Sequence, residues 1–266
     1  MDRLILGRYI PGNSFLHQLD PRSKLLAMFI FLFIIFWANN LVTNLLLLAF
    51  VFLLIVLSGI KFTFFLSGLK PMIGIILFTT LFQVFFTSGK EVIWSFGFIT
   101  LTLEGLQQAL VIFVRFILII FFSTLLTLTT TPLSLADGIE TGLAPLRRFK
   151  VPVHEIGLML SMSLRFVPTL MDDTTRIMNA QRARGVDFNE GNIIQKVKSV
   201  IPILIPLFAS SFKRADALAT AMEARGYQGG EGRTKYRVLE WKKKDSLAMF
   251  MMLILSVLLY FLKSNG

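Results

Sequence analysis

The sequence contains no cysteine, which excludes disulfide bonds and thiolate metal sites. Histidine is almost as scarce, since His17 and His154 are the two copies, and His154-Glu155 lacks the second histidine of a zinc-protease helix. There is no Gly-x-x-x-x-Gly-Lys-Ser/Thr phosphate-binding loop and no Gly-x-Ser-x-Gly nucleophile elbow. We therefore expect a non-catalytic protein with no metal site and no cofactor, which does not hold ATP itself.

Apolar residues are abundant instead. Hydrophobic residues make up 55% of the 266 positions, phenylalanine alone contributes 27, and the mean hydropathy is +0.70. The surface of a soluble domain of this length could not carry so much apolar area, so the composition indicates a membrane protein.

The net charge of +11 is concentrated between Pro132 and Lys244. In a membrane protein, such a basic block is typical of a segment kept on the cytoplasmic side, next to anionic lipid. No nucleic-acid-binding motif accompanies the charge, so nucleic acid is not an expected partner.

Five apolar runs suggest transmembrane helices, at residues 25–38, 41–57, 69–87, 106–130 and 246–262. The first has only 14 residues and is expected to be extended by the long side chains of residues 22–24. The first two form one run that is broken at Asn39-Asn40. As one helix that run would be about 50 Å long, against a hydrocarbon core of about 30 Å, so the asparagine pair is expected to turn the chain. The sequence thus predicts an all-α polytopic protein with four transmembrane helices in 1–131, a cytoplasmic coupling domain in 132–244 and a last transmembrane helix in 245–266.

The short loops predict the orientation. Basic residues occur in the N-terminal segment and in the second loop, and the first loop has no charge; the basic residues are Arg3, Arg8, Arg22, Lys24, Lys61 and Lys70. The positive-inside rule then places the N-terminus and the basic block in the cytoplasm of a bacterial cell, with the chain crossing the cell membrane several times.

Arg115 lies inside the fourth apolar run, where a charge is costly. Two interpretations remain open for it. Arg115 serves the function directly, or it faces the interior of the bundle and binds backbone carbonyls or a partner subunit.

Three helices are predicted in the basic block, at residues 132–148, 152–184 and 192–225. Pro168, Pro202 and Pro206 fall inside the last two and are expected to kink them. Both long helices begin apolar and end polar, which favours rods that run from the membrane towards a soluble partner. The alternative is a helical hairpin that packs on itself.

The two long helices end in the same way. Residues 180–185 (AQRARG) and 221–226 (AMEARG) share their alanine, alanine, arginine and glycine positions. A single Ala-Arg-Gly would be read as a glycine cap with an arginine that complements the helix dipole. Two copies at equivalent ends predict a paired partner, because the planar guanidinium group donates bidentate hydrogen bonds to carboxylates or exposed carbonyls. The candidate docking residues are Ala183, Arg184, Gly185, Ala224, Arg225 and Gly226.

With these features in place, the sequence resembles the transmembrane T component (EcfT/CbiQ-like) family of energy-coupling factor (ECF) transporters, a branch of the ABC importers. The resemblance covers nearly the whole chain. It depends on the stretch from Arg214 to Tyr227 (RADALATAMEARGY), on the earlier Ala-Arg-Gly, and on the segment from Pro11 to Leu25 (PGNSFLHQLDPRSKL).

The resemblance implies that both Ala-Arg-Gly ends dock onto two cytoplasmic ABC ATPase subunits, which bind the ATP. It also implies that the rest of the chain holds a membrane-embedded S component, which releases a vitamin or other micronutrient into the cell. Two alternatives remain at this point: a self-sufficient secondary transporter, and a membrane scaffold for another cytoplasmic complex.

Overall fold

A computed structural model describes residues 9–87, 92–96, 99–188, 192–229 and 239–264. The basic residues Arg3 and Arg8 lie outside this range. Contacts divide the chain into two compact units, Met1–Thr141 with Leu239–Gly266 and Gly142–Val238. This division groups residues 132–141 with the first unit, although the sequence prediction assigns them to the coupling domain. The domain boundaries expected from the sequence stay a prediction.

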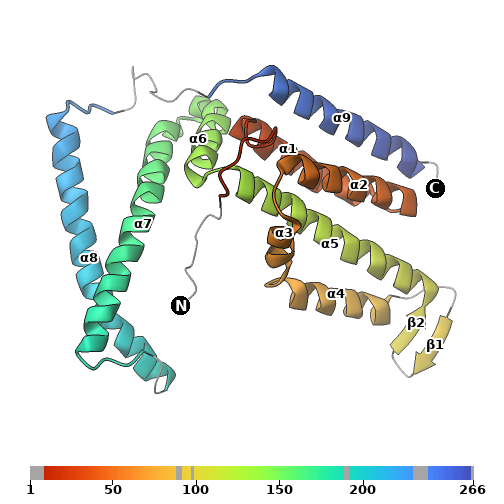
Figure 1. The fold of residues 1–266 in the computed structure, drawn as a ribbon, viewed down its shortest axis with the longest axis horizontal. Coiled ribbons are helices and arrows are strands. Elements are labelled where there is room, and N and C mark those ends of the chain that lie inside the picture. The colour runs from red at the N-terminus through yellow and green to blue at the C-terminus, as the bar shows by residue number, and fades with distance from the viewer. Residues whose placement is uncertain (1–8, 88–91, 97–98, 189–191, 230–238, 265–266) are drawn as a thin grey trace. The chain divides into compact units, whose positions relative to one another are not determined.

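The first unit consists mainly of helices, as predicted (Figure 1). Its helices are α1 (Pro21–Ile34), the 3₁₀ helix η1 (Ile35–Trp37), α2 (Leu41–Ser58), α3 (Phe62–Leu69), α4 (Ile73–Phe86), α5 (Leu103–Thr129), α6 (Pro132–Gly142) and α9 (Lys243–Ser264). A short antiparallel hairpin, β1 (Val92–Phe96) and β2 (Ile99–Thr102), precedes α5 and was not predicted.

The predicted turn at Asn39-Asn40 is confirmed. The first helix ends at η1, and Asn40 is the N-cap of α2, where its backbone N–H donates to the Thr43 hydroxyl over 3.1 Å. This reciprocal capping satisfies amide groups that the first turn of a helix cannot pair internally. Two short helices therefore replace one overlong helix.

The third predicted span, residues 69–87, contains one helix, α4, which begins four residues later than predicted. Helix α3 before it was not predicted, and the two helices form a pair bent by 64°. Pro71 lies in the break between them, where it has no N–H to continue a helical ladder and its ring crowds the preceding turn. Helices α2, α5 and α9 are long and apolar enough to cross a membrane singly, and the bent pair is so only if counted as one span. In the second unit, the helical residues Ile194–Ala224 are also long and apolar enough to cross a membrane. Helix α1 has 14 residues, which is short for a transmembrane helix.

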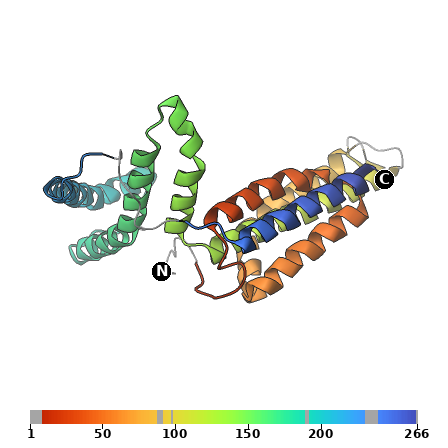
Figure 2. The same ribbon diagram turned by 90° about the horizontal axis from the view of Figure 1, so that it is seen from above.

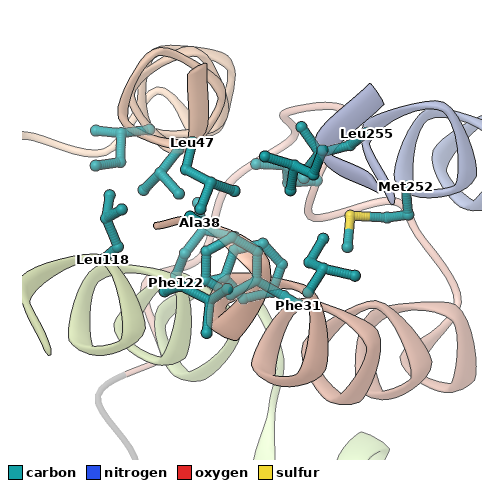
Figure 3. Packing of buried hydrophobic residues seen from close by; sticks show 14 of the residues in the cluster. Phe31, Ala38, Leu47, Leu118, Phe122, Met252 and Leu255 are labelled. Carbon is teal, nitrogen blue, oxygen red and sulfur yellow. The ribbon is translucent and has the colours of Figure 1, made fainter. Parts of the chain in front are cut away.

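The core of the first unit lies where α1, α2, α5 and α9 meet (Figure 3). Phe31 of α1 and Phe122 of α5 stack with their ring centroids 4.2 Å apart, and Leu47, Leu118 and Met252 surround them. In Figure 2, α9 runs beside α1, so the last helix packs against the first. Outward-facing residues of these helices are largely apolar, as a bilayer requires.

One buried carboxylate ties the ends of this bundle together. Asp245, at the start of α9, is fully buried. Its Oδ1 accepts hydrogen bonds from the Asp20 backbone N–H over 2.7 Å and from the Ser23 hydroxyl over 2.8 Å, while Oδ2 accepts from the Lys242 N–H over 2.8 Å. We call Asp20, Ser23, Lys24 and Asp245 the Asp245 knot.

The knot also reaches the helices that lead to the second unit. Lys24 donates from Nζ to the Thr129 carbonyl and the Thr130 hydroxyl at the end of α5, each over 3.0 Å. Helix α6 packs on the same turn of α1, since a Cβ at Gly138 would lie 3.2 Å from atoms of Pro21 and Leu25. The first turn of α1 thus contacts the end of α5, α6 and the start of α9.

We predict that Asp245→Ala lowers the free energy of unfolding by about 3 kcal/mol, because it removes a buried carboxylate that accepts three hydrogen bonds and leaves the buried Asp20 N–H without an acceptor. Thermal unfolding of the detergent-purified protein measures the effect. The matched control is Asp172→Ala on the exposed face of its helix, which we expect to change stability by no more than about 0.5 kcal/mol. Equal midpoints for the two variants would contradict the role given to Asp245.

Candidate functional site

The second unit contains the 3₁₀ helix η2 (Ala144–Phe149) and two long helices, α7 (Val153–Ala183) and α8 (Ile193–Ala224). The bounds of both long helices agree with the predicted ranges to within a residue. The predicted first helix of the block ends early, at Gly142, and is followed by η2. Pro168, Pro202 and Pro206 lie inside the long helices, as expected.

Helices α7 and α8 cross each other (Figure 1). The Arg214 Nη2 atom lies 2.7 Å from Asp173 Oδ2, and the guanidinium carbon of Arg214 lies 5.8 Å from the centre of the Phe166 ring. Nearer the end of α7, Gln181 donates to the Pro202 carbonyl over 3.4 Å. That carbonyl is free to accept because the residue four positions later is a proline without an N–H.

The order of these contacts makes the pair antiparallel, because later residues of α7 meet earlier residues of α8. The C-terminal ends therefore lie at opposite ends of the pair (Figure 1). The two helices thus contact each other where they cross, as the hairpin alternative expects, and the interpretation as rods that run from the membrane towards a soluble partner stays a prediction. An apolar stripe runs along α8 and includes Ile201, Ile205, Phe208 and Phe212. This stripe stays exposed within the described residues, with Phe208 60% and Phe212 72% accessible.

Both helix ends have the same backbone geometry. Arg184 and Arg225 are the C-caps, with φ, ψ of −86°, 5° and −90°, 7°. The glycines that follow take left-handed φ values of 87° and 70°. In α7 the Val186 N–H reaches back to the Gln181 carbonyl over 3.1 Å, and Gly185 N–H to that of Arg182 over 2.9 Å.

In α8 the corresponding bonds run from Tyr227 to Met222 over 3.0 Å and from Gly226 to Glu223 over 2.8 Å. Each end is thus a Schellman motif, which pairs the last carbonyls of the helix and fixes its final turn. The predicted glycine caps are confirmed at both ends.

The six candidate docking residues are exposed. Among the residues that the structure describes, none forms a hydrogen bond or ion pair with the side chain of Arg184 or Arg225. Each guanidinium group therefore projects from a rigid helix end with small alanines beside it. Such a group can donate bidentate hydrogen bonds to a carboxylate or to exposed carbonyls of a groove that admits the helix end.

The two ends differ at one equivalent position. Arg182 stands two residues before Arg184, and its guanidinium carbon lies 5.8 Å from the centre of the Phe188 ring. The corresponding residue in α8 is Glu223, which is exposed. The end of α7 is therefore more basic than the end of α8.

Arg115 does not belong to this site. It lies in the first unit, where its Nη2 donates to the Ala38 carbonyl over 3.2 Å and its guanidinium carbon lies 5.1 Å from the centre of the Phe36 ring. The interpretation that it binds a backbone carbonyl is confirmed. Over the described ranges, no group of three His, Cys, Asp or Glu side chains is placed to hold a metal ion.

We predict that Gly185→Ala and Gly226→Ala each destabilise the last helical turn by about 1 kcal/mol, because a Cβ is strained at these φ values. Hydrogen exchange of amides 184–186 and 225–227 should become several-fold faster. The matched control is Gly142→Ala, where φ is ordinary and no atom lies within 4 Å of the added Cβ. Unchanged protection in both variants would refute the assignment of these caps.

Comparison with known proteins agrees with this picture. Residues 12–236 match the CbiQ family model, described as "Cobalt transport protein". A protein of Streptococcus equi is 75% identical over 99% of this chain and 98% of its own length, and one of Bacillus subtilis is 50% identical over 99% and 100%. A protein of Lactococcus lactis is 61% identical over 97% of both. All three are named energy-coupling factor transporter transmembrane protein EcfT, and the chain belongs to this family of transmembrane components of energy-coupling factor transporters.

Proposed function

We propose that this chain is the coupling subunit of an importer, which passes ATP-driven motion of two ATPase subunits to a membrane-embedded S component. The transported substrate is a vitamin or another micronutrient held by the S component. The observation that carries the proposal is the pair of exposed, identically capped arginines, Arg184 and Arg225, at opposite ends of one crossed helix pair.

The geometry suits transmission of force. A Schellman cap holds the last turn of each helix, so a push on the arginine acts on the whole helix and not on a frayed end. The crossing is pinned by the Arg214–Asp173 ion pair and by the hydrogen bond from Gln181 to Pro202. Movement of one helix end is therefore expected to displace the other helix as well.

The exposed apolar stripe of α8 supports a membrane-embedded partner. Its members recur at three- and four-residue steps on one side of the helix: Val197, Ile201, Leu204, Ile205, Phe208 and Phe212. Each is more than 40% accessible. Large apolar surfaces of this kind are covered by lipid or by another protein in the working assembly.

The alternatives predict different behaviour. A secondary transporter would take up substrate when it is reconstituted alone in liposomes, whereas a coupling subunit would not. A scaffold for another complex would co-purify with proteins other than ATPases. The name shared by the relatives, energy-coupling factor transporter transmembrane protein, favours the coupling subunit over both.

We predict that Arg184→Ala and Arg225→Ala each weaken binding of one ATPase by about 2 kcal/mol or more, as expected for a buried arginine hot spot. The double variant should lose both the co-purified ATPases and substrate uptake. The matched controls are Arg176→Ala on α7 and Lys213→Ala on α8, two exposed basic residues away from the helix ends, which should keep the ATPases. Full assembly and uptake in the double variant would disprove the proposal.

A second prediction concerns the charge difference between the two ends. If each end fits its own ATPase groove, the double exchange Arg182→Glu with Glu223→Arg places the wrong charge at both, and co-purified ATPase should fall about fivefold. The neutral pair Arg182→Gln with Glu223→Gln is the control and should lose less. Wild-type assembly of the exchanged variant would show that these flanking charges do not distinguish the two grooves.

A further inference from the structure

The helical hairpin α1–α2 is short compared with α5. Lys24 is bonded to the end of α5 at Thr129, and Ala38 is bonded to Arg115 further back along α5. The segment from Lys24 to Ala38 and the segment of α5 from Arg115 to Thr129 each contain 14 residue steps, or about 21 Å of helix. Helix α5 then continues for another 12 residues, about 18 Å, to Leu103. Arg115 therefore lies level with the turn between α1 and α2, and not in the middle of a full-length bundle.

A polar hollow opens at this level. It has a volume of about 500 Å³ and is lined by Arg115 together with Asn39, Glu104, Gln107 and Gln108. Arg115 has five N–H donors, and the carbonyl of Ala38 takes one of them. The hollow thus combines a cation with neutral amides and one carboxylate.

An apolar groove between α2 and α5 continues from the hollow. A second cavity of about 490 Å³ shares Asn39, Gln107 and Val111 with the hollow. A third, of about 170 Å³, shares Leu48 and Val114 with the second. The lining changes along this path from amides to aliphatic and aromatic side chains, which at the far end are Val51, Phe52, Ile55, Leu118 and Phe121.

We propose that this polar-to-apolar path binds one glycerophospholipid of the bilayer, with its phosphate on Arg115 and an acyl chain in the α2–α5 groove. Phosphate suits a planar guanidinium group, which it engages through two oxygens. The amides of Asn39 and Gln107 offer acceptors to the hydroxyl or ammonium group of a headgroup.

The shape of the groove suits an extended chain. The two apolar cavities join at Leu48 and Val114, and the volume falls from about 490 Å³ to about 170 Å³ along the path. The groove follows α2 from Leu45 to Ile55, a length of about 15 Å that an acyl chain can fill.

The experiment is a titration of the delipidated, detergent-purified full chain with dioleoyl-phosphatidylglycerol, dioleoyl-phosphatidylethanolamine and dioleoylglycerol, which lacks phosphate. Native mass spectrometry counts the retained lipid, and thermal unfolding reports stabilisation. The wild type should retain one phospholipid and should prefer either phospholipid to dioleoylglycerol by about fivefold or more. The first two lipids differ only in headgroup, so the ratio of their retained amounts shows which headgroup the site prefers.

Variants separate the two parts of the site. Arg115→Met should abolish the preference for phosphate, and Arg115→Lys, which keeps the charge, should retain part of it. Leu48→Trp should block the groove and reduce retention of all three lipids, whereas Leu53→Trp, an exposed residue of the same helix outside the groove, should behave like the wild type. If the wild type, Arg115→Met and Leu48→Trp retained the same amounts of all three lipids, the proposal would be overturned. A cross-link from a cysteine at position 48 to a partner protein, formed in the assembled complex, would also overturn it.

Discussion

The buried carboxylate of Asp245 is the contact on which the rest of the first unit depends. It accepts from the N-terminal turn of α1 and from the backbone just before α9, so it joins segments that are more than 200 residues apart. Lys24, one position beyond Ser23, extends the same cluster to the end of α5. The chain passes to the second unit after α6 and returns at Leu239, so the helices on both sides of that excursion are held by one turn of α1.

Such a cluster has a clear physical reason. A charge buried among apolar helices is tolerable only when each of its acceptor or donor positions is satisfied, and a satisfied network rigidifies the place where it forms. The two helix ends of the second unit use a different device, because glycine and backbone hydrogen bonds fix their last turns while the arginines stay exposed. The second unit thus has stiff helix ends where contact with partners is proposed, and the first unit has a buried carboxylate that fixes its bundle.

Local signals predicted much of this structure. Pro152 precedes the first turn of α7 and Asn192 caps the first turn of α8, and a glycine follows the last turn of each helix. The left-handed conformations of Gly185 and Gly226 follow from the lack of a Cβ. The asparagine pair marked the turn between α1 and α2 through local chemistry too, because asparagine is a favoured N-cap and Asn40 caps α2. The exposed state of both Ala-Arg-Gly ends follows from their charge and from their position in the polar halves of the helices.

Long-range contacts were not predictable in this way. The antiparallel crossing depends on Arg214 meeting Asp173, 41 residues earlier, and each looks like an ordinary surface charge in the sequence. Asp245 reads as an acidic residue in the first turn of a helix, with no sign that Ser23 is its partner. The break between α3 and α4 did have a signal, Pro71, but the apolar run on either side concealed it.

The absence of cysteine from the chain provides the most direct test of the central claim, that the two arginine-bearing ends each contact an ATPase. Single cysteines at Ala183 and Ala224, beside the intact arginines, can be cross-linked in the assembled complex without any background thiol in this chain, and Ser163→Cys on the exposed face of α7 is the control. The account predicts that positions 183 and 224 each cross-link to an ATPase subunit and that position 163 does not. Cross-links from only one end, or from neither, would contradict it.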